Sequence, residues 1–230
     1  MLQQTRVESV VGRYERFLLR FPDFERLAGA GLSEVLAEWQ GLGYNRRAAA
    51  LHAIAGKVMG DFSGLLPDDE RVLATLPGIG TATAASIAAF AFNRPSVLIE
   101  TNIRRVFLHC FFPGRDAVPD REILPIVAAA CDRGNPREWY YALMDLGSEW
   151  KTRFPNPNRR SAHYRRQSPF EGSTRQARGA IVKILIAEDS LTCGELGARL
   201  ALDQNRFQSA LDQLKKEGLV KDEEGRIRLG

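Results

Sequence analysis

The 230-residue sequence has few cysteines, no long hydrophobic stretch and no sign of an export signal. Its three cysteines, Cys110, Cys131 and Cys193, are scattered, which argues against a disulfide framework or a four-cysteine metal site and favours a reducing compartment. No apolar run approaches the roughly 18 residues of a membrane span. The polar start at 1–5 is unlike a signal peptide. We therefore expect a cytoplasmic protein that makes no contact with a membrane.

The first two-thirds of the chain also lacks the alternating apolar pattern of β-strands. Apolar residues instead recur at helical spacing, which predicts an all-α domain over residues 1–150. The predicted helices cover 7–21, 32–39, 46–59, 67–76, 81–92, 102–111, 120–132 and 136–150.

The C-terminal region has a different pattern. Residues 177–230 show three short amphipathic helices, at 177–187, 192–200 and 205–217, and then two short strands around a turn at 222–225. This order resembles a small winged helix-turn-helix domain. Such domains bind DNA or other proteins. The slightly acidic charge of this region weakens the DNA reading, but both readings stay open and the partner is unknown.

Positive charge is concentrated between these two regions. The formal net charge is +4, but residues 151–178 carry eight Lys or Arg residues and one acid, Glu171. The prolines and asparagines of 151–176 predict a loop. A basic strip between slightly acidic regions favours binding of a polyanion, nucleic acid first. The alternative is a solvated linker between domains.

The clearest local motif is Leu-Pro-Gly-Ile-Gly at 76–80, which stands between two predicted helices. Two glycines permit a tight turn, and the next helix directs its backbone N–H groups toward the same place. Gly78, Ile79 and Gly80 are therefore predicted to hold a DNA phosphate, as in a helix-hairpin-helix. The alternative is an ordinary turn between two helices.

Further motifs stand in order along residues 1 to about 150. They are Met-Leu-Gln-Gln-Thr at 1–5, Gly-Leu-Gly-Tyr at 41–44, the hairpin at 76–80, Asn-Ile-Arg-Arg-Val at 102–106 and Met-Asp-Leu-Gly at 144–147. Together they resemble the helix-hairpin-helix base-excision DNA glycosylases and are most similar to the adenine-removing, MutY-type branch. The hairpin alone fits the whole superfamily, including the endonuclease III type.

The resemblance implies roles at the DNA for several residues. Gln3 and Gln4 would insert into the base stack, and Tyr44 would intercalate beside the partner base, which offsets part of the cost of flipping a base out of the helix. Asn102 would also contact DNA. Without the family context, Tyr44 would be read as a half-buried aromatic residue with a satisfied hydroxyl. The hairpin carbonyls would offer a site for a monovalent cation.

The resemblance also implies the chemistry. Glu100 stands where the family has its catalytic aspartate, and its carboxylate would stabilise positive charge on the sugar in the transition state. The alternative is a solvated acid at a helix start. Ala82 stands where bifunctional relatives carry a Schiff-base lysine, so the enzyme would be monofunctional and leave an abasic site.

Two further departures from the family pattern concern the ends of this domain. The adenine branch has a glutamate two positions before the methionine of its first motif, and this sequence begins at that methionine. An N-terminal truncation is the favoured interpretation, and the alternative is that the protein lacks this acidic group. The four-cysteine iron–sulfur motif of many members is absent after residue 150, so no cluster is expected. The basic strip stands in its place, and its arginines are predicted to contact phosphates: Arg159, Arg160, Arg165 and Arg166.

The sequence thus predicts a monofunctional DNA glycosylase of base excision repair. We expect a monomer without cofactor that binds double-stranded DNA containing a mismatched or damaged base, and that associates with the nucleoid in a prokaryote. Adenine opposite guanine or 8-oxoguanine is the expected substrate. A thymine or uracil mismatch glycosylase and a non-catalytic DNA-binding relative are the alternatives.

Overall fold

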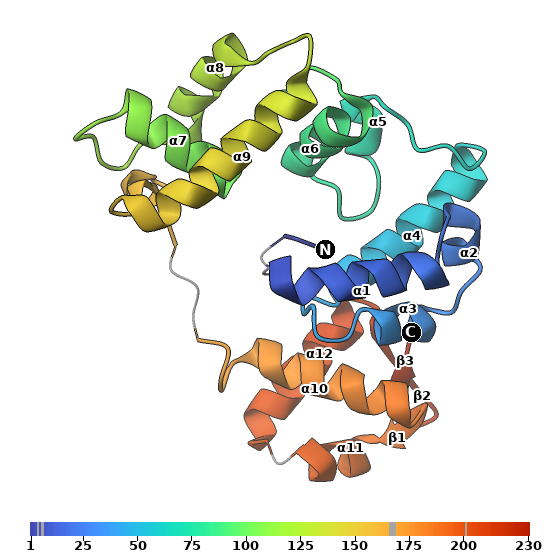
Figure 1. Ribbon diagram of the computed structural model, residues 1–230. Coiled ribbons are helices and arrows are strands. Elements are labelled where there is room, and N and C mark those ends of the chain that lie inside the picture. Colours follow the sequence, from blue (N-terminus) through green and yellow to red (C-terminus); the bar gives the residue numbers. More distant parts are fainter. Residues whose placement is uncertain (4, 6, 166–168, 201) are drawn as a thin grey trace. The chain divides into compact units, whose positions relative to one another are not determined.

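A computed structural model describes residues 1–3, 5, 7–165, 169–200 and 202–230 (Figure 1). The chain divides into two compact units, of which the first comprises Met1–Leu66 with Ser168–Gly230 and the second Pro67–Gln167. Both units consist mainly of α-helices, which confirms the predicted helical fold of residues 1–150. Within the described residues, no helix is long and apolar enough to cross a membrane.

The N-terminal part of the first unit is helical throughout. Its helices are α1 (Val7–Arg20), α2 (Phe24–Ala28), α3 (Leu32–Glu38) and α4 (Arg46–Asp61). Pro22 follows the end of α1, as expected for a residue that disfavours helix in the residue before it. The short helix α2 was not predicted; it begins where the Asp23 side chain accepts a hydrogen bond from the backbone N–H of Arg26 at 2.8 Å.

The C-terminal part of the same unit contains helices and a small sheet. In chain order the elements are α10 (Thr174–Ala187), β1 (Ser190–Thr192), α11 (Cys193–Leu200), α12 (Gln204–Lys216), β2 (Val220–Glu223) and β3 (Arg226–Leu229). The sheet is antiparallel with the order β1-β3-β2. The predicted hairpin is present, and positive φ at both Glu224 and Gly225 gives it the turn that suits the strand twist. Strand β1 was missed because it has only three residues.

One hydrophobic cluster connects the two parts of the first unit. Val35 and Leu36 of α3 and Ile181 and Leu185 of α10 are all buried in it, and α10 packs against α3. The C-terminal elements therefore bury apolar side chains in the same core as the N-terminal helices. A separate winged-helix domain is not shown, and the boundaries at 150 and 176 remain predictions.

The second unit is also helical, and one of its helices makes contacts with several of the others. Its elements are α5 (Glu70–Leu73), α6 (Thr81–Phe92), α7 (Thr101–Phe111), α8 (Asp120–Ala130), α9 (Pro136–Arg153) and the 3-10 helix η1 (Pro157–Arg160). Helix α7 packs against α8, α9 and η1 (Figure 1). Ile103 and Leu108 of α7, Ile123 of α8 and Tyr140 of α9 are completely buried. Helix α5 is shorter than the predicted segment 67–76, because the chain turns after Leu73 toward the hairpin.

Candidate active site

Glu100 stands immediately before α7 and caps its first turn. Its Oε1 atom accepts hydrogen bonds from the backbone N–H groups of Asn102 at 2.5 Å and Ile103 at 2.9 Å. These bonds turn the side chain back onto the start of the helix, where the helix dipole favours a negative charge. Both bonds use Oε1, so within the described part of the chain Oε2 is not tied to a donor. Glu100 is thus a capping acid at the start of α7, and its catalytic role remains a prediction.

Helix α9 packs closely against the start of α7. Gly147 of α9 is buried against it, and a Cβ added there would stand 2.7 Å from the Cβ of Asn102 and closer still to its backbone. The buried side chain of Arg105 donates hydrogen bonds to Asn102 Oδ1 at 2.7 Å and to the Gly147 carbonyl. Burial lowers the pKa of Arg105, and the nearby charge of Glu100 opposes that shift. Asn102, predicted to bind DNA, therefore has an internal partner in this structure.

Tyr140 anchors the segment that leads to Glu100. Its hydroxyl donates to the Ser96 carbonyl at 2.7 Å and accepts from the Leu98 N–H at 3.2 Å. Burial raises the pKa of Tyr140 to about 12, so the hydroxyl stays protonated and keeps both bonds at any physiological pH. The chain from 96 to 100 thus reaches α7 in a defined position.

The hairpin has the geometry that its glycines predict. Gly78 has a φ of +71°, which favours glycine, and the Ile79 N–H closes the turn on the Leu76 carbonyl at 3.1 Å. Gly80 caps α6 without a side-chain hydrogen bond, and the space above it is open, since an added Cβ would meet nothing within 4 Å. Ile79 is buried and holds the turn to the core. Backbone N–H groups at the start of α6 therefore face accessible space.

The loop at 41–44 presents Tyr44 at the surface of the first unit. Gly41, Gly43 and Tyr44 all have positive φ, and Tyr44 has this unfavourable conformation (φ +50°) without being glycine. Its side chain is 39% exposed. Arg175 of α10 donates a hydrogen bond to its hydroxyl at 3.1 Å. The hydroxyl of Tyr44 is thus satisfied, as the alternative reading expected, but the residue is exposed and not half-buried. The intercalating role remains a prediction.

Arg47 joins this loop to the first residues of the chain. Its guanidinium donates to the carbonyls of Met1 at 3.1 Å and Gln3 at 2.6 Å and to Thr5 Oγ1 at 3.1 Å. It also donates to the carbonyls of Leu42 and Gly43 at 3.3 Å. Desolvation lowers the pKa of this arginine. The predicted DNA contact Gln3 is exposed, whereas Gln4 lies outside the described residues.

The predicted arginines of the basic strip have different environments. Arg160 donates to the carbonyls of Leu108 at 3.0 Å and Phe112 at 2.8 Å and so closes the C-terminal end of α7. Arg159 and Arg165 are exposed, and Arg166 lies outside the described residues. Phosphate contact remains a prediction for this group, and its exposure makes Arg159 better suited to it than Arg160.

These candidates fall on both units. Glu100, Asn102, the hairpin glycines, Arg159, Arg160 and Arg165 belong to the second unit. Gln3 and Tyr44 belong to the first.

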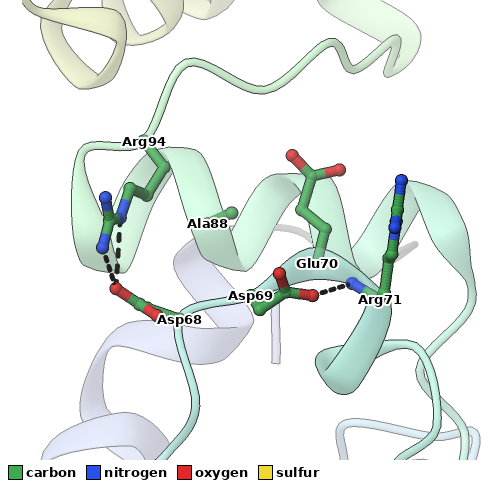
Figure 2. Close-up of a pocket in the computed structure, with 6 residues that line it drawn as sticks. All are labelled: Asp68, Asp69, Glu70, Arg71, Ala88 and Arg94. Atoms are coloured by element: carbon green, nitrogen blue, oxygen red, sulfur yellow. Dashed lines mark hydrogen bonds and ion pairs between the residues drawn. The ribbon is translucent and has the colours of Figure 1, made fainter.

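A hollow of about 450 Å³ lies elsewhere on the second unit (Figure 2). Figure 2 shows Asp68 paired with Arg94 and Asp69 bonded to the backbone of Arg71, so both carboxylates have partners within the protein. The hydrogen bond from Arg94 lowers the pKa of Asp68. None of the predicted site residues lines this hollow.

The donor set does not fit an iron–sulfur cluster. Such clusters require cysteine thiolates from one neighbourhood, whereas η1 and the residues around it contain none. Cys110 and Cys131 belong to the second unit and Cys193 to the first. In the described residues, no group of three or more His, Cys, Asp or Glu side chains is arranged to hold a metal ion.

Comparison with known proteins agrees with the motif order. The HhH-GPD superfamily of base excision DNA repair proteins matches residues 1–124. The adenine DNA glycosylase of Mycobacterium tuberculosis (strain ATCC 25618 / H37Rv) is 33% identical over 241 residues, which are 96% of this chain and 79% of that protein. The adenine DNA glycosylase of Mycolicibacterium smegmatis is also 33% identical, over 100% of this chain and 84% of that protein.

Two solved structures share the fold. A thermostable thymine-DNA glycosylase superposes with a TM-score of 0.55 at 22% identity, over 64% of this chain and 69% of that chain. An endonuclease III from a non-covalent complex with DNA superposes with a TM-score of 0.50 at 20% identity, over 73% of this chain and 72% of that chain.

The fold and the ordered motifs define a DNA glycosylase of base excision repair. The chain belongs to the HhH-GPD superfamily, whose members hydrolyse N-glycosidic bonds.

Proposed function

We propose that this chain is a monofunctional adenine glycosylase, which removes adenine opposite guanine or 8-oxoguanine from double-stranded DNA. The observation that carries the proposal is the Glu100 carboxylate, which two backbone N–H groups hold at the start of α7. The choice of adenine is supported by 33% identity to mycobacterial adenine DNA glycosylases over nearly the whole chain.

Glu100 would act by electrostatic stabilisation. Breaking the bond between adenine and C1′ builds positive charge on the sugar, and a fixed carboxylate near that charge lowers the barrier. Oε1 holds the side chain on the helix, and Oε2 would face the sugar. The capping bonds fold back the additional methylene of glutamate relative to aspartate, which keeps the carboxylate close to the helix start. The bond between adenine and C1′ breaks, and water adds its hydroxyl group to C1′. In the net reaction the second hydrogen of that water becomes the proton on the released adenine.

DNA binding would use the hairpin and the exposed arginines. The open, side-chain-free start of α6 at Gly80 offers N–H groups to a phosphate. Exposed Arg159 and Arg165 would neutralise further phosphates. Because Ala82 has no amine, the reaction would stop at the abasic site without cleavage of the strand. We propose that it proceeds without an iron–sulfur cluster.

The test compares wild type with Glu100→Gln and Glu100→Asp in single-turnover base release, with alkali to reveal abasic sites. Glutamine keeps an oxygen for the capping bonds but loses the charge, so we expect unchanged duplex binding and a rate at least about 100-fold lower. Aspartate keeps the charge but moves it, with an expected loss of the order of 100-fold.

The substrates are duplexes with A:8-oxoguanine, A:G, T:G and U:G pairs. Release from the adenine pairs supports the proposal, whereas release only from T:G or U:G replaces it with a pyrimidine glycosylase. If wild type binds all four duplexes and releases no base, the chain is a non-catalytic DNA-binding relative. A faster Glu100→Asp variant would mean that the glutamate impairs an aspartate site.

A further inference from the structure

Tyr44 accepts a hydrogen bond from a residue that is 131 positions away in the sequence. Arg175 lies in the first turn of α10 and donates from Nη1 to the Tyr44 hydroxyl at 3.1 Å. Its Nη2 atom lies 3.4 Å from the Pro169 carbonyl. Ser173 caps α10 through a side-chain hydrogen bond to the Gln176 N–H, which fixes the helix start from which Arg175 extends.

Arg47 also contacts the tyrosine, through its ring. Its guanidinium lies 5.3 Å from the centre of the Tyr44 ring and 5.6 Å from that of Trp39. Hydrogen bonds to the carbonyls of residues 1, 3, 42 and 43 fix the guanidinium in place. Tyr44 also has a positive φ, a conformation that persists only where its surroundings determine it. Two arginines, one from α4 and one from α10, thus contribute to the orientation of an exposed aromatic ring.

We propose that Arg175 is a positioning residue, through which the C-terminal part of the chain sets the orientation of the Tyr44 ring toward the DNA. This inference rests on the proposed function, a glycosylase that acts on double-stranded DNA, and on the role at the DNA that the family resemblance implies for Tyr44. It gives α10 a role in recognition of the partner base that is independent of any nucleic-acid contact by α12 or the sheet.

The physical reason is the freedom of an exposed tyrosine. A ring that is 39% exposed gains rotamer freedom when the hydrogen bond from Arg175 is lost, and binding then has to select one orientation. A hydrogen bond from a charged donor is stronger than a neutral one, so its loss weakens binding about tenfold. The bond does not touch the reacting atoms, so the rate at saturating enzyme is expected to be unchanged.

The experiment is a double-mutant cycle of Arg175→Ala and Tyr44→Phe, which removes the donor or the accepting hydroxyl. Binding is measured on a duplex with an uncleavable 2′-fluoro-2′-deoxyadenosine opposite 8-oxoguanine, with 2-aminopurine beside the partner base to report stacking. We expect Arg175→Ala to weaken binding about tenfold when Tyr44 is intact and to have no further effect in the Tyr44→Phe background. Arg175→Lys, which retains a donor, is expected to restore part of the affinity.

Lys183→Ala is the matched control, because Lys183 is an exposed cation on the same helix. It is expected to leave affinity and 2-aminopurine fluorescence unchanged. If Arg175 instead contacted a phosphate, its loss would reduce the salt dependence of binding by about 0.9 in slope, with or without the Tyr44→Phe substitution. Additive effects of the two substitutions, or that change in slope, would overturn the inference.

The cycle also separates this inference from the proposed function. If wild type releases no base but the coupling between Arg175 and Tyr44 appears in duplex binding, the proposed function fails and the positioning role stands. If wild type releases adenine and the two substitutions are additive, the positioning role fails and the proposed function stands. A ¹⁹F spectrum of 3-fluorotyrosine at position 44 in the free protein is expected to change with Arg175→Ala and not with Lys183→Ala. A wild-type spectrum in the Arg175→Ala variant, or an equal change in both variants, would also contradict the inference.

Discussion

The start of α7 and the loop at 41–44 hold their candidate functional side chains by different means. Backbone N–H groups of α7 hold Glu100, and a tightly packed glycine supports them from α9. Long arginine side chains hold Tyr44. A bond from a helix backbone requires no additional ordering of a side chain, whereas each arginine loses rotamer freedom when it is held.

This difference suits the two tasks. A charge that stabilises a transition state has to stay within about 0.5 Å of its working position, so it belongs on a rigid element. A ring that meets the DNA surface tolerates adjustment, and side chains can supply its support from two distant parts of the sequence. Backbone N–H groups of a packed helix start thus hold the catalytic candidate, whereas side chains from two distant helices hold the recognition candidate. The following substitutions test each side of this comparison.

The largest effect is expected for Gly147→Ala, which disrupts the packing of α9 against the start of α7. A Cβ there would collide with Asn102 and displace the start of α7. We expect a loss of about 1–3 kcal/mol in the free energy of unfolding and about 100-fold in single-turnover rate. Urea unfolding measures the free energy of unfolding, and single-turnover base release measures the rate.

Gly56→Ala is the control. Gly56 lies within α4, and an added Cβ would have nothing within 4 Å, so a gain of about 0.5–1 kcal/mol in the free energy of unfolding is expected. A Gly147→Ala variant with wild-type activity would show that α7 is less constrained than its packing indicates.

An intermediate effect is expected for Arg47→Ala, which removes the support of the recognition side. The carbonyls near Met1 and in the loop lose a charged donor, with an expected cost of about 2 kcal/mol in stability. Affinity for the mismatched duplex is expected to fall more than tenfold, while the rate at saturating enzyme stays near that of wild type. Arg46→Ala removes the same charge from an exposed neighbour. Equal losses of affinity for the two variants would mean that charge, and not position, matters at Arg47.

The smallest effects are expected for two neighbouring arginines of the basic strip, of which Arg159 is exposed and Arg160 bonds to the protein itself. Arg159→Ala is expected to lower the salt slope of duplex binding by about 0.9 and to leave stability unchanged. Arg160→Ala is expected to cost about 1 kcal/mol in stability, because two carbonyls at the end of α7 lose their donor, and to leave the slope unchanged. Each variant serves as the control for the other in fluorescence titrations from low to high salt and in urea unfolding. If instead Arg160→Ala lowered the salt slope and Arg159→Ala lowered the stability, Arg160 would be the phosphate contact and Arg159 the structural residue.

Much of the fold follows from patterns within single segments. Periodic apolar residues predicted the long helices, and Gly78 and Gly80 predicted the hairpin, because these signals depend on local backbone geometry. The short elements were missed or misjudged: α2 depends on one capping aspartate, β1 has three residues, and α5 ends earlier than its pattern indicated. Short segments carry too few residues for periodicity to be read.

Several residues that support the candidate site gave only weak signals in the sequence. Arg105 and Gly147 stood within recognised motifs, but their contact joins α7 to α9 and is visible only in three dimensions. Arg47 and Tyr140 carried no separate signal, since an arginine beside Tyr44 and a tyrosine in an amphipathic helix are ordinary in isolation. Arg175 was one of eight basic residues in its segment, and charge alone assigned it to a strip.

By itself, the sequence determined the helical class, the hairpin, the position of Glu100 at the start of a helix and the membership of a DNA glycosylase family, because spacing and residue type are properties of neighbouring positions. Only the tertiary structure decided that the C-terminal helices share a core with the N-terminal ones, that Arg160 closes α7 and that Arg175 reaches Tyr44. These contacts form when apolar faces of distant segments are buried together. No pattern within one segment shows which distant side chains that burial brings within hydrogen-bonding distance.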